Sequence, residues 1–141
     1  MKALFDTSVL VATFLADHEF HARSLDAFLR FKPSEAGCAA HSLAELYASL
    51  TRLPGKHRVS PEHAVLFLEQ ARARLTLVAL DAEEYYQALQ DASTRGIVGG
   101  TIYDALVVRC AVKGKADVLY TWNVKHFELI AGEMGRRIRV P

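Results

Sequence analysis

The sequence predicts an α/β fold in which helices alternate with the strands of a mainly parallel sheet. Short runs of apolar and β-branched residues recur along the chain, and helical periodicity follows most of them. This alternation is typical of parallel α/β domains. About half of the 141 residues are hydrophobic, and neither an internal repeat nor a linker interrupts the pattern. We therefore predict a single domain over residues 1–141 with its own core.

Clear start signals mark several elements of the N-terminal half. An apolar strand comes first, and Asp6 begins the helix that follows it. Ser60 and Pro61 are residue types favoured at the N-cap and at the first position of a helix. The pattern predicts strands at residues 2–5, 37–41 and 75–80 and helices at residues 7–16, 19–31, 42–53 and 61–74.

The C-terminal half continues the alternation. Asp81 is a predicted N-cap, and the glycine-rich segment 96–100 separates the helix after it from an apolar helix that opens at Thr101. The pattern predicts helices at residues 82–95, 101–112 and 123–132 and strands at residues 118–122 and 137–140.

The composition says more about where the protein is located in the cell than about what it binds. The formal net charge of +1 identifies no class of partner. No apolar run approaches the roughly 18 residues that a membrane helix needs, and the N-terminus lacks a signal-peptide pattern. Cys38 and Cys110 lie far apart in apolar contexts, as expected for reduced cysteines. We expect a cytoplasmic protein without a membrane partner.

Four polar residues lie within a turn of predicted helix starts. They are Asp6, Glu45, Asp104 and Asn123. In open α/β sheets, ligands bind at the carboxyl ends of the strands beside helix N-termini. The same residues are also good helix caps, and Glu45 and Asp104 each complete a capping-box pattern with Ser42 or Thr101. Capping is therefore the alternative interpretation for each residue taken singly.

The surroundings of the three carboxylates favour a shared cation. Asp6, Glu45 and Asp104 lie in apolar segments without Lys or Arg in their immediate flanks. Charged groups are rarely buried without a partner or a metal ion. Carboxylate oxygens are the ligands that Mg²⁺ and Mn²⁺ prefer. We therefore expect a Mg²⁺ site, in which Mn²⁺ can substitute.

Four segments resemble the conserved motifs of a known family. LFDTSVL, SLAELYASLTRLPG, TIYDALVVRCA and YTWNVKHF are similar, in order and spacing, to PIN-domain ribonucleases. The likeness is strongest to the toxin member of VapBC-type toxin–antitoxin pairs. It implies a three-layer α/β/α domain and a Mg²⁺-dependent endoribonuclease that leaves a 5′-phosphate and a 3′-hydroxyl.

The resemblance also assigns residues. Asp6, Glu45 and Asp104 fall on the acidic positions that hold the metal, and Asn123 occupies the fourth catalytic position, which is often Asp. Ser8 and Thr121 match the hydroxyls that hold the acidic side chains, although both are equally ordinary cap or turn residues. A catalytically inert PIN-like module that binds RNA or protein is the alternative function, because Asn123 carries no charge. A phosphoryl-transfer domain with Asp6 as acceptor fits less well.

Further residues and partners complete the prediction. Arg52, Lys56 and Arg58 surround a loop that either grips RNA phosphates or is simply solvated. His126 lies near Asn123 and is either a substrate contact or part of an ordinary amphipathic turn. The resemblance implies RNA as substrate, a homodimer, and a groove for the C-terminal segment of a cognate antitoxin.

Overall fold

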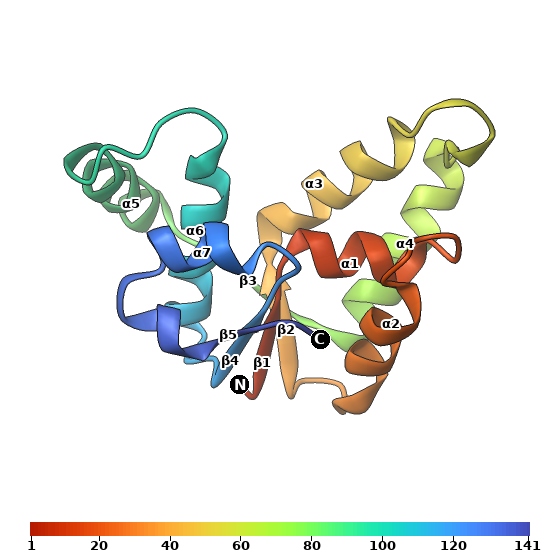
Figure 1. Ribbon diagram of the computed structural model, residues 1–141, viewed down its shortest axis with the longest axis horizontal. Helices are drawn as coiled ribbons and strands as arrows, with labels where there is room; N and C mark the ends of the chain where they lie inside the picture. Colours follow the sequence, from red (N-terminus) through yellow and green to blue (C-terminus); the bar gives the residue numbers. More distant parts are fainter.

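A five-stranded parallel sheet forms the centre of the protein (Figure 1). The computed structural model describes residues 1–141. All neighbouring strands pair in parallel, so the predicted α/β class is confirmed. The order across the sheet is β3 (Thr76–Val78), β2 (Ala36–Ala39), β1 (Ala3–Phe5), β4 (Val118–Tyr120) and β5 (Ile138–Arg139).

Helices connect the strands. The helices are α1 (Thr7–Phe14), α2 (His21–Arg30), α3 (Ala40–Thr51), α4 (Pro61–Arg74), α5 (Ala82–Thr94), α6 (Thr101–Lys113) and α7 (Val124–Ile130). Two 3₁₀ segments, η1 (Gly55–His57) and η2 (Gly132–Arg137), complete the connections. None of these helices combines the length and apolar character that crossing a bilayer requires.

The sheet separates two apolar clusters, which makes the domain three-layered. Successive strand residues point to opposite faces, so Leu4 packs with α5, α6 and α7, whereas Ala3 and Phe5 pack with α1, α2, α3 and α4. Figure 1 shows these two groups of helices on opposite sides of the sheet. The predicted α/β/α arrangement is therefore confirmed.

The central strands pack closely because small residues line them. A Cβ added to Gly37 of β2 would lie 2.5 Å from the Thr76 carbonyl oxygen and 2.6 Å from Met1 Cε. Gly37 therefore lets β2 approach its neighbours. β1 occupies the middle of the sheet, between β2 and β4. Its carboxyl end is consequently the point where residues from several connections can meet.

Element boundaries agree with the sequence where a side chain caps the helix. The Ser60 side chain accepts a hydrogen bond from His63 N, and Asp81 forms a capping box with Glu84, as the residue types predict. The helix predicted from Ser42 begins earlier, at Ala40. The predicted strands are longer than those observed: residues 40 and 41, predicted as strand, belong to α3, and β3 ends at Val78 although the apolar run continues to Leu80.

Candidate active site

Asp6 lies at the end of the central strand and is held by hydroxyl groups. Its Oδ2 atom accepts hydrogen bonds from Ser8 Oγ at 2.7 Å, Ser8 N at 3.3 Å and Thr121 Oγ1 at 2.9 Å. Only 3% of Asp6 is exposed. Ser8 Oγ also accepts from Trp122 N, which ties the end of β4 to the start of α1. A buried carboxylate is thus fixed by neutral donors and has no basic partner.

Glu45 and Asp104 approach from the two sides of the sheet. Glu45 lies on α3, and its Oε1 atom accepts a hydrogen bond of 3.2 Å from Thr7 Oγ1. Asp104 lies in the first turn of α6. Both residues are partly buried. One carboxylate therefore comes from the junction after β1, a second from the helix after β2, and a third from the helix before β4.

The three carboxylates repel one another. Burial raises the pKa of Glu45 above its usual value, and the charges of Asp6 and Asp104 raise this pKa further, against a lowering by the hydrogen bond from Thr7. Burial and the charge of Asp6 likewise raise the pKa of Asp104. No Lys or Arg forms an ion pair with any of the three. Like charges are thus gathered without a permanent basic counterion.

Two histidines contact the outer carboxylates. His126 Nε2 of α7 lies 2.8 Å from Asp104 Oδ2. His41 Nε2 of α3 donates to the Tyr103 carbonyl at 3.2 Å and lies 3.5 Å from Glu45 Oε1. Sequence reasoning missed His41, although its position one helical turn before Glu45 could have indicated the contact.

Helix capping explains only one of the acidic residues. Asp6 is the N-cap of α1, and its side chain accepts from the backbone of the first turn. The N-caps of α3 and α6 are Ala39 and Gly100, and neither has a side-chain cap hydrogen bond. The capping-box interpretation of Glu45 and Asp104 is therefore wrong.

Comparison with known proteins identifies the fold and the family. The PIN domain family model matches residues 3–132. The chain belongs to the PIN-domain family. Its curated relatives include two Mycobacterium tuberculosis proteins, and the resemblance seen in the sequence is thereby confirmed. Ribonuclease VapC40 is 35% identical over 135 residues, covering 96% of this chain and 92% of the relative. Ribonuclease VapC27 is 34% identical over 114 residues, covering 80% of this chain and 79% of the relative.

Solved structures share the same fold. VapC20 from Mycobacterium tuberculosis, described as a sarcin–ricin loop cleaving toxin, superimposes with a TM-score of 0.72 at 17% identity, covering 89% of this chain and 92% of that chain. DNA-bound VapBC from Salmonella typhimurium gives a TM-score of 0.67 at 24% identity, covering 99% of this chain and 98% of that chain. At these identities the likeness shows the three-layer PIN fold.

The three carboxylates of the PIN domain are ligands of the type that Mg²⁺ prefers, but they do not enclose a preformed metal site. No three His, Cys, Asp or Glu side chains converge closely enough to form a ready-made metal site. The charge of Asp6 nevertheless raises the pKa of Glu45 and of Asp104, and a cation between the carboxylates would relieve that repulsion. Mg²⁺ commonly binds through one or two carboxylates and keeps waters for substrate phosphate. The residues therefore fit the ion.

Asn123 lies at the rim of the acidic site. It is exposed and stands at the N-cap of α7, but its side chain makes no cap hydrogen bond. Its backbone N–H donates to Thr121 Oγ1 at 3.0 Å. The structure thus connects Asn123 to Asp6 through the Thr121 hydroxyl and leaves the Asn123 amide free to meet solvent or a ligand.

The predicted basic residues lie away from the carboxylates. Arg52 ends α3, and Lys56 and Arg58 belong to the exposed segment after it, where Arg58 Nε donates to the Leu53 carbonyl. At 1.5 Å per residue, Arg52 lies about 10 Å along the helix from Glu45. Figure 1 shows this segment at the end of α3 far from the sheet. Contact of Arg52, Lys56 and Arg58 with RNA stays a prediction.

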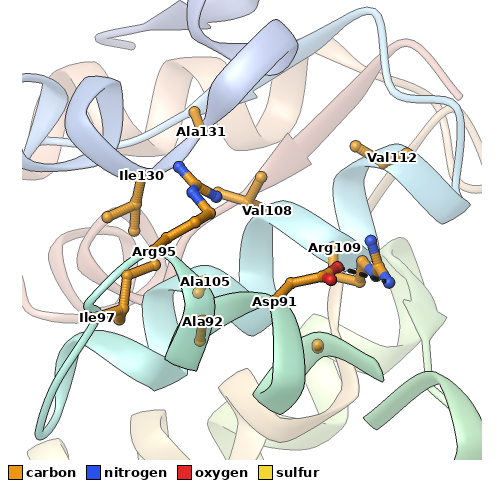
Figure 2. Close-up of a pocket in the computed structure, with 11 residues that line it drawn as sticks. Asp91, Ala92, Arg95, Ile97, Ala105, Val108, Arg109, Val112, Ile130 and Ala131 are labelled. Carbon is orange, nitrogen blue, oxygen red and sulfur yellow. Dashed lines mark ion pairs between the residues drawn. The ribbon is translucent and has the colours of Figure 1, made fainter. Parts of the chain in front are cut away.

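A separate cavity lies between α5, α6 and α7. It has a volume of about 150 Å³ and is lined mostly by apolar residues. Figure 2 shows Arg95 extending toward Ile130 and Ala131, while Asp91 and Arg109 form an ion pair at 3.3 Å. None of the predicted catalytic residues lines this cavity. This cavity of the PIN domain is therefore distinct from the acidic site.

Proposed function

We propose that this PIN domain hydrolyses RNA phosphodiester bonds with the help of Mg²⁺ and acts as the toxin of a toxin–antitoxin pair. One observation carries the proposal: the charge of Asp6 acts on both Glu45 and Asp104 at the same edge of the sheet, and none of the three forms an ion pair with Lys or Arg. The ribonuclease relatives support RNA as the substrate.

The residues have different roles in this proposal. Bound Mg²⁺ supplies charge neutralisation of the phosphodiester and a water of lowered pKa. Asp6, fixed by Ser8 and Thr121, and Asp104 bind the ion. Glu45 orients the attacking water, and burial raises its pKa, which favours its accepting a proton. Asn123 offers an uncharged oxygen at the rim.

RNA cleavage by the purified protein tests the proposal. End-labelled structured RNAs are incubated with Mg²⁺, with Mn²⁺ and with EDTA, using the wild type, Asp104→Asn and the control Asp91→Asn. Asp91 is matched because it is an aspartate on the neighbouring helix α5, outside the acidic site. We expect metal-dependent cleavage by the wild type and Asp91→Asn, loss in Asp104→Asn, and products with 5′-phosphate ends.

Other outcomes select other functions. Products with cyclic phosphate ends would reject a water-based mechanism. Metal binding by calorimetry without cleavage of any RNA would favour the inert PIN-like module, for which the uncharged Asn123 is the supporting feature. Cleavage that persists in EDTA would reject the role of the ion.

An apolar groove supports the antitoxin partner. A cavity of about 450 Å³ lies between α1, α2 and α4, and Phe14, Phe28 and Phe67 contribute to its lining. Leu29, in the same lining, is 54% exposed. The VapBC neighbours are complexes of this fold with an antitoxin. We assign the groove to an apolar segment of the cognate antitoxin.

Co-expression with a candidate cognate antitoxin tests the groove. Leu29→Asp is expected to weaken the complex and restore toxicity. Leu129→Asp is the matched control, because Leu129 is 80% exposed on α7 and lies outside the groove. Equal binding by both variants would place the antitoxin elsewhere.

Exposed apolar residues on α5 support a homodimer. Tyr86 and Leu89 are 59% and 47% exposed and are three residues apart, so they share one helix face. Sedimentation velocity is expected to show a dimer for the wild type and a monomer for Leu89→Asp. A wild-type monomer at all concentrations would reject the dimer.

A further inference from the structure

The first turn of α6 carries Asp104 but has little local support. Gly100 precedes it without a side-chain cap, and the first buried residue of the helix is Leu106. The connection from α5 includes Gly99, with a φ of +60°, and Val98, which is 78% exposed. Figure 1 shows this connection arching away from the sheet. Neither capping nor core packing therefore fixes the Asp104 turn.

Two histidines supply hydrogen bonds to this turn from other helices. His41 Nε2 on α3 donates to the Tyr103 carbonyl at 3.2 Å. His126 Nε2 on α7 lies 2.8 Å from Asp104 Oδ2. One bond holds the backbone directly before Asp104, and the other holds its carboxylate. The two histidines come from opposite faces of the sheet, because α3 and α7 belong to different apolar clusters.

Each contact constrains a different degree of freedom. The Tyr103 carbonyl can only accept, so His41 must carry its proton on Nε2, and burial favours the neutral ring by lowering the pKa of His41. The His41 bond limits movement of the backbone of α6 relative to α3. The His126 bond restrains the Asp104 side chain through Oδ2 and leaves Oδ1 without a hydrogen bond.

We infer that His41 and His126 are positioning residues that brace the first turn of α6 and thereby set the location of the Asp104 carboxylate in the acidic site. The inference rests on the proposed function in one respect, because that function assigns Asp104 to metal binding. It goes beyond that function by assigning the placement of Asp104 to side chains that bind neither metal nor RNA. Side chains that orient metal-binding residues typically affect metal affinity or activity by about 10–100-fold.

Paired variants separate hydrogen bonding from packing. His41→Leu and His126→Leu keep most of the side-chain volume and remove the donor, whereas His41→Gln and His126→Gln keep a donor. His63→Leu is the control, because His63 is an exposed histidine on α4. Hydrogen exchange of the amides of residues 102–107 is measured in the metal-free protein. We expect exchange to be about fivefold faster in the Leu variants, the factor of roughly one hydrogen bond, and near wild type in the Gln variants and the control.

Function is measured on the same variants. The Leu variants are expected to bind Mn²⁺ about tenfold more weakly and to lower kcat with little change in KM, and the Gln variants to recover most of the loss. Exchange unchanged in the Leu variants, or Gln variants as fast as Leu variants, would overturn the inference. If the wild type bound no Mn²⁺ and cut no RNA, the proposed function would fail. The exchange data would still show whether His41 and His126 stabilise the first turn of α6.

One measurement needs no variant and remains decisive if a variant fails to fold. Nitrogen-15 NMR of the imidazole rings reports which nitrogen carries the proton. A protected proton on Nε2 of both rings is expected. A proton on Nδ1 alone in His41 would overturn the inference, because Nε2 could not then donate to the Tyr103 carbonyl.

Discussion

Thr121 Oγ1 donates a 2.9 Å hydrogen bond to Asp6 Oδ2 across 115 residues of sequence. The register of the sheet explains this contact. Phe5 pairs with Tyr120, so the residues that follow them leave the ends of two adjacent strands together. The central strand therefore delivers the carboxylate, and its neighbour delivers the hydroxyl that holds it.

Replacing Thr121 by Val is expected to reduce both stability and cleavage. Val has a similar shape but removes the donor to Asp6 and the acceptor for Asn123 N, and an unsatisfied buried group costs about 1–3 kcal/mol. Urea denaturation and RNA cleavage measure the two effects. Thr121→Ser, which keeps the hydroxyl, should retain cleavage, and full activity in Thr121→Val would contradict this role of the hydroxyl.

Asp6→Asn is expected to slow cleavage strongly while leaving the fold intact. Loss of a metal-binding charge at a cost of about 3 kcal/mol in the transition state lowers the rate by about a hundredfold. The charge of Asp6 raises the pKa of Glu45 and Asp104, so its removal relieves repulsion. Thermal unfolding should give a Tm equal to or above that of the wild type. Retained cleavage would remove Asp6 from the site.

Asn123 should be the most tolerant of the four predicted catalytic residues. It is exposed, and its side chain has no cap hydrogen bond to lose. Asn123→Ala is expected to change the cleavage rate by less than about tenfold, and Asn123→Asp to tighten Mn²⁺ binding by adding a negative charge. Metal titrations by calorimetry measure the second effect. A complete loss of activity in Asn123→Ala would show that the amide contacts a reacting group.

Gly37→Ala is expected to be strongly destabilising. The new methyl group would lie 2.5 Å from the Thr76 backbone oxygen, so two strands of the sheet would have to separate. A cost of about 1–3 kcal/mol is typical of such overpacking and is measurable in urea. Gly135→Ala is the matched control, because no atom lies within 4 Å of an added Cβ there. Equal stability of the two variants would contradict the packing argument.

The two cysteines should resist thiol reagents in the folded protein. Burial raises the pKa of Cys38 to about 12 and that of Cys110 to about 11, so almost no reactive thiolate exists near neutral pH. Ellman's reagent at pH 8 should react with both thiols only after denaturation. Rapid reaction of the native protein would indicate local opening around the sheet.

The sequence predicted the fold better than it predicted the contacts of the site. All five strands were expected, because apolar runs mark buried strands directly. The helix start at Ser42 was wrong because the spacing of Ser42 and Glu45 imitates a capping box, whereas the true N-cap, Ala39, has no capping side chain. The contact between His41 and the Tyr103 carbonyl was missed because its partner is a backbone group 62 residues away, which leaves no trace in side-chain patterns, unlike the contact with Glu45 one helical turn away.

The central place of β1 has a consequence for the order of synthesis. β1 precedes the other four strands of the sheet in the sequence, yet its partners begin at Ala36 and Val118. Its two hydrogen-bonded neighbours are therefore complete only when most of the chain has left the ribosome, and such distant pairings form slowly. A nascent chain lacks Thr121 and cannot yet hold Asp6. The acidic site is therefore completed only late in synthesis, after β4 and Thr121 have been made.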